Sequence, residues 1–166
     1  VDRILSEPLL RVRPASMSDM RLLFEWANDP LTRQMSFRSE SIPWETHQVW
    51  FGRVINDSRT WLMIVELREE RRENWRPLGQ VRVDPDGTVS ISLDPAYRGR
   101  GLSLPALEKT IEHFQAECNR ERHLRAYIKP KNRASRRIFE QARFKFVCET
   151  TVANQVCLKY AYGSEQ

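Results

Sequence analysis

A glycine-containing turn between two ordered runs places the strongest constraint on how this chain can fold. Residues 97–103 read Tyr-Arg-Gly-Arg-Gly-Leu-Ser and separate a β-branched run, 89–93, from an amphipathic run, 104–117. This order predicts a strand, a tight turn and a helix N-terminus. Gly99 and Gly101 leave the backbone without side-chain cover, so several N–H groups can point at one anion beside the positive end of the helix dipole. The stretch therefore predicts a phosphate cradle.

Length and composition favour a single domain covering residues 1–166. The chain has 166 residues, of which 40% are hydrophobic, enough for one sizeable core. No apolar run reaches the roughly 18 residues that span a bilayer, and the N-terminus has no signal-peptide pattern. The cysteines, Cys118, Cys148 and Cys157, are odd in number and show no Cys-x-x-Cys spacing. We expect a soluble, cytoplasmic protein with no disulfide framework, no metal site and no membrane partner.

The charge of the chain favours anionic partners. The formal net charge is +5 and the sequence pI is about 9.4, which suits a phosphorylated cofactor as well as nucleic acid. The most highly charged stretch, 68–76, contains four Arg and three Glu, which nearly cancel. We interpret it as a solvated hairpin tip and expect no nucleic-acid partner.

The periodicity of apolar residues predicts seven strands and four helices. The strands are expected at 9–14, 60–67, 78–84, 88–93, 124–128, 146–152 and 156–162, and the helices at 18–27, 43–54, 104–117 and 132–141. Ser18 is the expected N-cap of the first helix, Pro43 opens the second and Asn132 caps the fourth.

Two motifs in this order of elements resemble those of a known enzyme family. Arg98-x-x-Gly101-x-Ser103 follows the pattern Arg/Gln-x-x-Gly-x-Gly/Ala, with a serine at the last position, and a second block runs from Asn132 to Phe144. Together they resemble the acetyl-CoA-binding motifs of the GNAT superfamily of N-acetyltransferases. The resemblance implies an α/β (α+β) fold of the GNAT type, with a mixed, strongly twisted central sheet of about seven strands flanked by about four helices.

The same resemblance implies that acetyl-CoA binds as the acetyl donor. Its pantetheine arm would lie beside the strand 88–93, its pyrophosphate would lie on the glycine turn, and the N–H near Leu93 would donate to the thioester oxygen. The residues implied for cofactor binding are Ile91, Leu93, Arg98, Gly99, Arg100, Gly101, Leu102, Ser103, Asn132, Ser135 and Phe139.

Catalysis in this family implies direct attack of an amine on the thioester in a ternary complex. Leu93, Ser92 and Glu66 are the candidate catalytic residues. Many relatives have a tyrosine general acid where this chain has Phe139, and some have a glutamate base where this strand has serines. The general base is left open between a water relay, Glu66 and His47.

Residues 26–51 are similar to the acetyltransferases that modify the 4-amino group of UDP-linked amino sugars in pseudaminic acid synthesis. The candidate acceptor-binding residues are Asn28, Met35, His47 and Trp50. A lone histidine on an apolar helix face is more often a core residue, so packing is the alternative for His47.

Three functions stay open at this point. The first is acetylation of a small-molecule amine, most of all a nucleotide sugar. The second is acetylation of a protein N-terminus or another small amine. The third is a non-catalytic acetyl-CoA-binding module. A homodimer and attachment to a larger protein of the sugar pathway are both compatible with the sequence.

Overall fold

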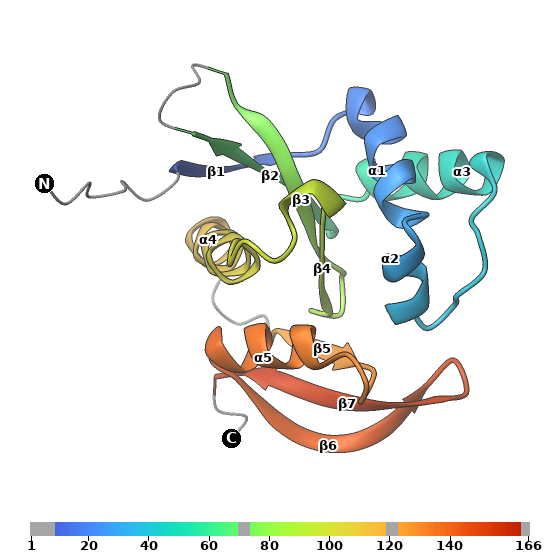
Figure 1. Cartoon of the computed structure of the whole chain (residues 1–166), viewed down its shortest axis with the longest axis vertical. Coiled ribbons are helices and arrows are strands. Elements are labelled where there is room, and N and C mark those ends of the chain that lie inside the picture. Colours follow the sequence, from blue (N-terminus) through green and yellow to red (C-terminus); the bar gives the residue numbers. More distant parts are fainter. Residues whose placement is uncertain (1–8, 70–73, 119–122, 164–166) are drawn as a thin grey trace, which may run out of the picture.

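A computed structural model describes residues 9–69, 74–118 and 123–163 of the chain (Figure 1). The strands of these ranges form two antiparallel sheets. The first sheet has the order β1 (Leu9–Pro14), β2 (Trp61–Arg68), β3 (Arg76–Val83) and β4 (Val89–Leu93). The second has the order β5 (Arg125–Ile128), β7 (Gln155–Tyr162) and β6 (Phe144–Val152). The centre of the predicted hairpin tip, residues 70–73, lies outside the described residues.

Five α-helices accompany the strands in the described ranges. They are α1 (Met20–Ala27), α2 (Pro30–Met35), α3 (Trp44–Ile55), α4 (Ser103–Glu117) and α5 (Arg133–Gln141), with 3-10 turns at Met17–Asp19 and Pro95–Tyr97. None of these helices is both long enough and apolar enough to cross a membrane. The seven strands and four helices predicted from sequence are confirmed, and α2 is an additional helix.

The beginnings of α1 and α2 differ from the prediction for local reasons. Ser16 is the N-cap of a 3-10 turn, where it forms a capping box with Asp19, and Asp19, not Ser18, is the N-cap of α1. The sequence predicted no helix between residues 27 and 43, a stretch that begins Asn-Asp-Pro. Asp29 instead accepts a hydrogen bond from the Thr32 N–H at 3.0 Å. Pro30 occupies the first turn, where its missing N–H costs nothing, so a new helix begins.

The backbones of the two sheets pair at one point, and the sheets diverge beyond it. Thr88 and Arg125 form a parallel bridge, and the Arg125 N–H donates to the Gly87 carbonyl at 2.9 Å. No other backbone hydrogen bond joins β4 to β5 in the described part of the chain. The expected central sheet is therefore two sheets that separate beyond this bridge, which opens a gap between β4 and β5.

The first sheet is covered on both faces, and its strands alternate accordingly. Val65 and Leu67 of β2 belong to the core cluster that includes α4, whereas Leu62 and Ile64 pack with α1 and α3. Figure 1 shows α4 on one side of this sheet and α1 and α3 on the other.

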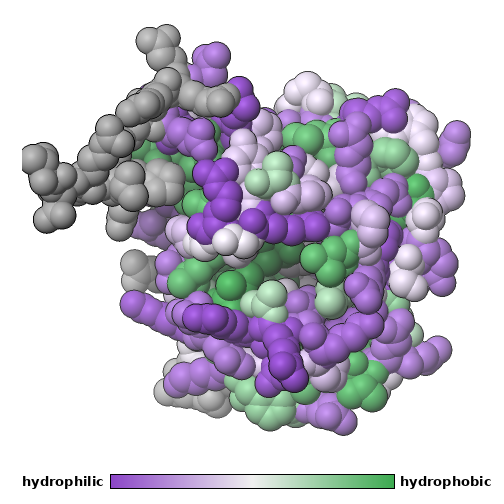
Figure 2. Space-filling view, in the orientation of Figure 1, coloured by the Kyte–Doolittle hydropathy of each residue, from purple (hydrophilic) through white to green (hydrophobic). Residues whose placement is uncertain are grey.

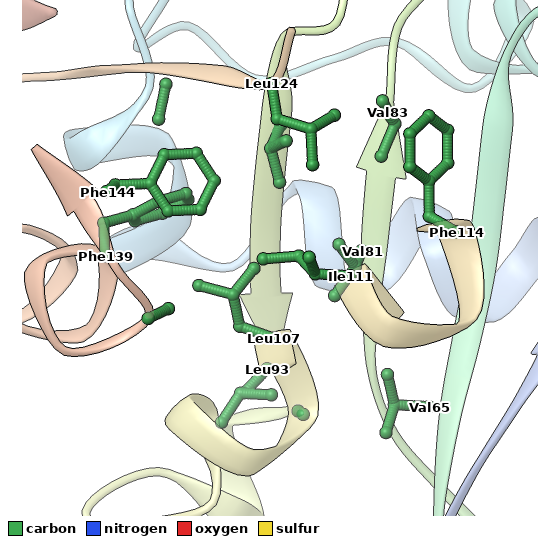
Figure 3. Packing of buried hydrophobic residues seen from close by; sticks show 14 of the residues in the cluster. Val65, Val81, Val83, Leu93, Leu107, Ile111, Phe114, Leu124, Phe139 and Phe144 are labelled. Atoms are coloured by element: carbon green, nitrogen blue, oxygen red, sulfur yellow. The ribbon is translucent and has the colours of Figure 1, made fainter. Parts of the chain in front are cut away.

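The main core lies between α4 and the two sheets. The predicted stripe of α4 is buried at Leu107, Ile111 and Phe114, which are at most 4% exposed. Figure 3 shows these side chains directed toward Val81 and Val83 of β3. Phe139 and Phe144 extend the same cluster into the second sheet, so one core supports both sides of the gap.

Gly87 is required at the junction of the sheets, and its replacement tests this. Its φ is +86°, and a Cβ there would lie 2.2 Å from the His123 carbonyl oxygen. We expect Gly87→Ala to lower the free energy of unfolding by about 2–4 kcal/mol in urea denaturation, because left-handed strain adds to a clash with backbone. Gly163→Ala is the matched control, since its φ is +78° and a Cβ meets nothing within 4 Å. Its expected cost is about 1 kcal/mol, and equal losses in the two variants would contradict the assignment.

Candidate functional site

The glycine turn lies directly after β4 and ends at the N-terminus of α4. Gly99 and Gly101 have φ values of +71° and +72°, which side-chain-bearing residues rarely adopt. Residues 99–101 are exposed. The predicted strand, turn and helix arrangement is confirmed, with Ser103 as the first residue of α4.

Unpaired N–H groups gather at this turn. In the described ranges, no acceptor faces the backbone N–H groups of residues 99–104, and the first bond of the helix runs from the Ala106 N–H to the Leu102 carbonyl at 3.1 Å. A Cβ on Gly101 would meet nothing within 4 Å, so the space beside the turn is open. Several free donors at the positive end of a 15-residue helix can hold an anion such as a pyrophosphate.

The two arginines of the turn have other partners. Arg98 forms an ion pair with Asp29 at 2.7 Å and donates to the Leu93 carbonyl at 3.2 Å. Arg100 pairs with Glu69 at 3.0 Å. Both were expected to bind phosphate, but their guanidinium groups are engaged with protein carboxylates. The anion cradle is therefore built mainly from backbone donors.

The gap beside β4 continues from this turn. Figure 2 shows a hollow between the half of the molecule that carries α4 and the half that carries α5, with hydrophobic residues inside and hydrophilic residues along both borders. Ile91 and Ser92 are half-buried, whereas the Leu93 side chain is part of the core. Because its side chain is in the core, only the Leu93 backbone can contribute to the site, and its donation to the thioester oxygen stays a prediction.

The second motif has a structural role at two of its three predicted cofactor positions. The Asn132 side chain caps α5 by accepting from the Ser135 N–H at 3.1 Å. Phe139 is 3% exposed and packs edge-to-face on Phe144, with ring centroids 4.9 Å apart. Its ring is enclosed in the core, so contact with a cofactor would require the core to open.

Glu66 is placed as an ion-pair partner. One carboxylate oxygen accepts from Arg11 and the other from Arg13 at 3.0 Å, and Arg13 also binds Asp19. A general base needs a free lone pair that faces the substrate. Both oxygens of Glu66 accept from arginines and the residue is 6% exposed, so its role in the structure is that of an ion-pair partner and its role as general base stays a prediction.

His47 lies in an aromatic cluster. It is 1% exposed, its ring centroid lies 5.4 Å from those of Phe24 and Trp50, and its Nε2 donates to the Met20 carbonyl at 3.0 Å. Burial lowers the pKa of His47 below 6.5, although the bond to Met20 opposes this. The packing alternative therefore accounts for His47, which cannot reach a nucleotide phosphate or accept a substrate proton from this position.

The other acceptor candidates are spread along residues 28–42, which we call the bridging segment, and α3. Asn28 closes the bridging segment on itself, because its side chain donates to the Ile42 carbonyl and accepts from the Ile42 N–H, at 3.1 and 2.7 Å. Met35 and Trp50 are half-buried and stay candidates. Trp50 lies beside Arg82, whose guanidinium carbon is 5.6 Å from the ring centroid.

Sequence reasoning missed two polar residues near the end of β4, Gln80 and Asp94. Gln80 donates to the Ser92 hydroxyl at 3.1 Å, and its own Oε1 is buried without a partner among the described residues. Asp94 accepts from the Trp26 indole at 2.9 Å and so ties α1 to the end of β4. The alternation of Gln80 with Val81 could have indicated a polar side chain on the face of β3 opposite to Val81. The contact between Trp26 and Asp94 joins positions too far apart in the chain to be predicted from sequence spacing.

Two replacements of Gly101 distinguish an effect on anion binding at the turn from an effect of backbone strain. We expect Gly101→Glu to weaken acetyl-CoA binding by about ten-fold or more in calorimetry, because a carboxylate would enter the open space where the pyrophosphate is expected. Gly101→Ala carries the same backbone strain without the charge and serves as the control. Unchanged affinity in a folded Gly101→Glu protein would remove the cradle from the site.

Burial of His47 predicts a pH-dependent stability. Because its folded-state pKa is lowered, its contribution is fully present above about pH 6.5 and is lost as the pH falls below that value. We expect the free energy of unfolding to decline between pH 7.5 and 5.5 more steeply in the wild type than in His47→Gln. The difference is bounded by about 1.4 kcal/mol per pH unit. Parallel urea-derived curves would show that His47 is not buried as a neutral ring.

Comparisons with known proteins identify the family. The family described as Acetyltransferase (GNAT) domain matches residues 10–145. No curated protein sequence matches the chain significantly.

Solved structures share the fold at low sequence identity. A domain from Methanocaldococcus jannaschii aligns with a TM-score of 0.77 at 20% identity, over 93% of this chain and 99% of that chain. Spermidine N-acetyltransferase from Vibrio cholerae, in complex with CoA and spermine, aligns with a TM-score of 0.77 at 12% identity, over 92% and 94% of the two chains. The aminoglycoside acetyltransferase AAC(6')-Ib, with ribostamycin and coenzyme A, gives 0.74 at 16% identity and 92% of both chains.

The family match covers most of the chain, from β1 to the start of β6, and the fold agrees with it. The free N–H groups of the glycine turn can hold an anion, which is consistent with the predicted position of the coenzyme A pyrophosphate. The chain belongs to the GNAT acetyltransferase family and is an acetyl-CoA-dependent N-acetyltransferase.

Proposed function

We propose that this enzyme acetylates an amine that also carries negative charge, and that its acceptor is the 4-amino group of a UDP-linked deoxy amino sugar. The proposal combines the resemblance of residues 26–51 with the charge of the bridging segment. A cytoplasmic location, and a homodimer or attachment to a larger protein of the sugar pathway, stay predictions.

The observation that carries the proposal is the half-buried guanidinium of Arg33, which has no carboxylate in ion-pair contact in the part of the chain that the structure describes. Arg33 donates to the Arg38 carbonyl at 3.1 Å and to the Ser36 hydroxyl at 3.0 Å, and its Nε is buried with no partner among the described residues. Burial lowers the pKa of Arg33, and the charge of Glu40 only partly opposes this. A half-buried guanidinium with one buried N–H left unpaired and no carboxylate in ion-pair contact among the described residues favours the binding of an anion.

The charges around Arg33 point in the same direction. Four cations belong to the bridging segment or bond to it, namely Arg33, Arg38, Arg98 and Lys129, against two carboxylates, Asp29 and Glu40. Asp29 is already neutralised by Arg98. Such a surface attracts a diphosphate and repels a polycation. Spermine and ribostamycin are bound by the two structural neighbours named above, and neither polyamine nor aminoglycoside suits this charge.

The proposed chemistry also fits the shortage of free bases. The acceptor nitrogen attacks the thioester carbon, an N–C bond forms, the C–S bond breaks and coenzyme A leaves as thiolate. An N–H proton leaves through water to bulk or to the thiolate. With Glu66 paired and His47 enclosed, a water relay near Ser92 is the proposed route, with the Leu93 N–H as the proposed donor to the thioester oxygen. A sugar amine is less basic than an alkylamine and needs less assistance.

A substrate screen tests the proposal. UDP-4-amino sugars, spermidine, an aminoglycoside and peptides with free N-termini are each incubated with acetyl-CoA, and released thiol is measured. We expect turnover with the UDP-amino sugars alone. Turnover of peptides or polyamines instead would overturn the proposed acceptor, and no turnover with any amine would favour a binding module.

A pair of variants tests whether the acceptor binds beside Arg33. Arg33→Gln is expected to raise the KM for the UDP-amino sugar by about ten-fold or more, since a charged hydrogen bond contributes about 1.5–3 kcal/mol. The KM for acetyl-CoA should stay within about two-fold. Arg53→Gln, on the basic last turn of α3, is the control. Equal KM values for Arg33→Gln and wild type would remove Arg33 from the acceptor site.

A further inference from the structure

The short helix α2 is tied at its two ends to opposite sides of the gap between the sheets. At its N-terminus, Asp29 pairs with Arg98, which follows β4. Near its C-terminus, the Gln34 carbonyl accepts from the Lys129 ammonium, which follows β5, at 3.2 Å. Figure 1 shows α2 beside the gap, between the end of the α1 layer and the second sheet. The bridging segment therefore spans the two strands that diverge around the donor.

The Arg98 end connects three parts of the site through one guanidinium. Arg98 reaches Asp29 at 2.7 Å, the Thr32 hydroxyl at 3.1 Å and the Leu93 carbonyl at 3.2 Å. Burial alone would raise the pKa of Asp29, but Arg98 and the Thr32 N–H outweigh it and hold this pKa below its usual value. The same residue opens the turn that carries the free N–H groups. One guanidinium thus joins the glycine turn to the first turn of α2.

The Lys129 end is a buried cation at a helix C-terminus. Lys129 is 8% exposed, and burial lowers the pKa of its ammonium, with Lys131 adding to the effect. Burying an ammonium group is costly unless the group gains a hydrogen-bond or ion-pair partner. The carbonyls at the end of α2 supply one, because the negative end of the helix dipole favours a cation. The glutamine side chain of Gln155, at the start of β7, donates to the Phe37 carbonyl and reinforces this side.

We infer that Arg98 and Lys129 are positioning residues that clamp α2 across the gap and couple donor binding to the arrangement of the acceptor-binding segment. Coenzyme A on the 99–104 donors fixes the turn, Arg98 transfers this order to Asp29, and Lys129 holds the far end of α2 against the second sheet. By linkage, ordering of the bridging segment by an acceptor strengthens donor binding to the same extent. The inference rests on the donor half of the proposed function and does not depend on the identity of the acceptor.

Amide hydrogen exchange of the whole chain, with and without saturating coenzyme A, tests the clamp. In the wild type, coenzyme A should slow exchange by about three-fold or more both in the turn and in residues 28–42. Asp29→Asn keeps the N-cap of α2, because asparagine caps as well as aspartate, but removes the ion pair. Lys129→Met keeps the length and the apolar stem. Each variant should keep protection of the turn and lose most of the protection of residues 28–42.

Matched controls and affinities decide the outcome. Asp57→Asn changes an aspartate paired with Arg59 before β2, and Lys131→Met changes an exposed lysine two residues after Lys129. Both should behave as wild type. Coenzyme A affinity by calorimetry should stay within about three-fold in all four variants.

Two kinds of result would overturn the inference. The first concerns hydrogen exchange: residues 28–42 exchange at the same rate when coenzyme A binds the wild type, or they keep full protection in Asp29→Asn and Lys129→Met. The second is a loss of coenzyme A affinity beyond about ten-fold in Asp29→Asn, which would make Arg98 part of the donor site itself. Neither readout uses an acceptor, so failure of the UDP-sugar screen leaves the test intact.

Discussion

The contact between the Gly87 loop and the start of β5 is the constraint on which the rest of the site depends. One parallel bridge, Thr88 with Arg125, and one backbone hydrogen bond join the two sheets. A longer ladder would satisfy the backbone groups of β4 and close the gap. Because pairing stops there and each sheet continues with its own twist, an extended ligand can lie along β4 and meet unpaired backbone groups. Close approach at Gly87 fixes the point from which the strands diverge.

Backbone groups and charged side chains divide the work around this gap. The donor cradle uses backbone N–H groups at a helix N-terminus. These groups can bind an anion without an ionisable side chain, so no side chain has to be ordered when the anion binds. Most charged side chains near the site connect segments to one another. Arg13 joins β1 to Asp19 and Glu66, and Arg98 joins the turn to α2. Removing one member of such a pair leaves an uncompensated charge, at a typical cost of about 3–5 kcal/mol when it is buried.

Few ionisable side chains are therefore free to take part in proton transfer. Among the described residues, the histidine and the glutamate that could have served as bases are occupied by packing and by ion pairs. Juxtaposition of two reactants then supplies most of the rate, and the acceptor must contribute a nitrogen that loses its proton readily. This requirement and the basic bridging segment are the two grounds on which we propose an anionic amino sugar as the acceptor in preference to a polyamine.

The sequence by itself determined the elements and the donor cradle. Periods of two and of 3.6, the caps, and the glycines at 99 and 101 are local properties, so they predicted all seven strands, four helices and the turn. Only the tertiary structure decided which polar residues are free to act. His47, Glu66 and Phe139 have the right chemistry for a site, but their neighbours come from Met20, from Arg11 and Arg13, and from Phe144. The two contacts on which the proposed clamp rests could not be predicted for the same reason. Arg98 with Asp29 and Lys129 with Gln34 are pairs separated by many tens of residues, and only the folding of the two sheets around one bridge brings them together.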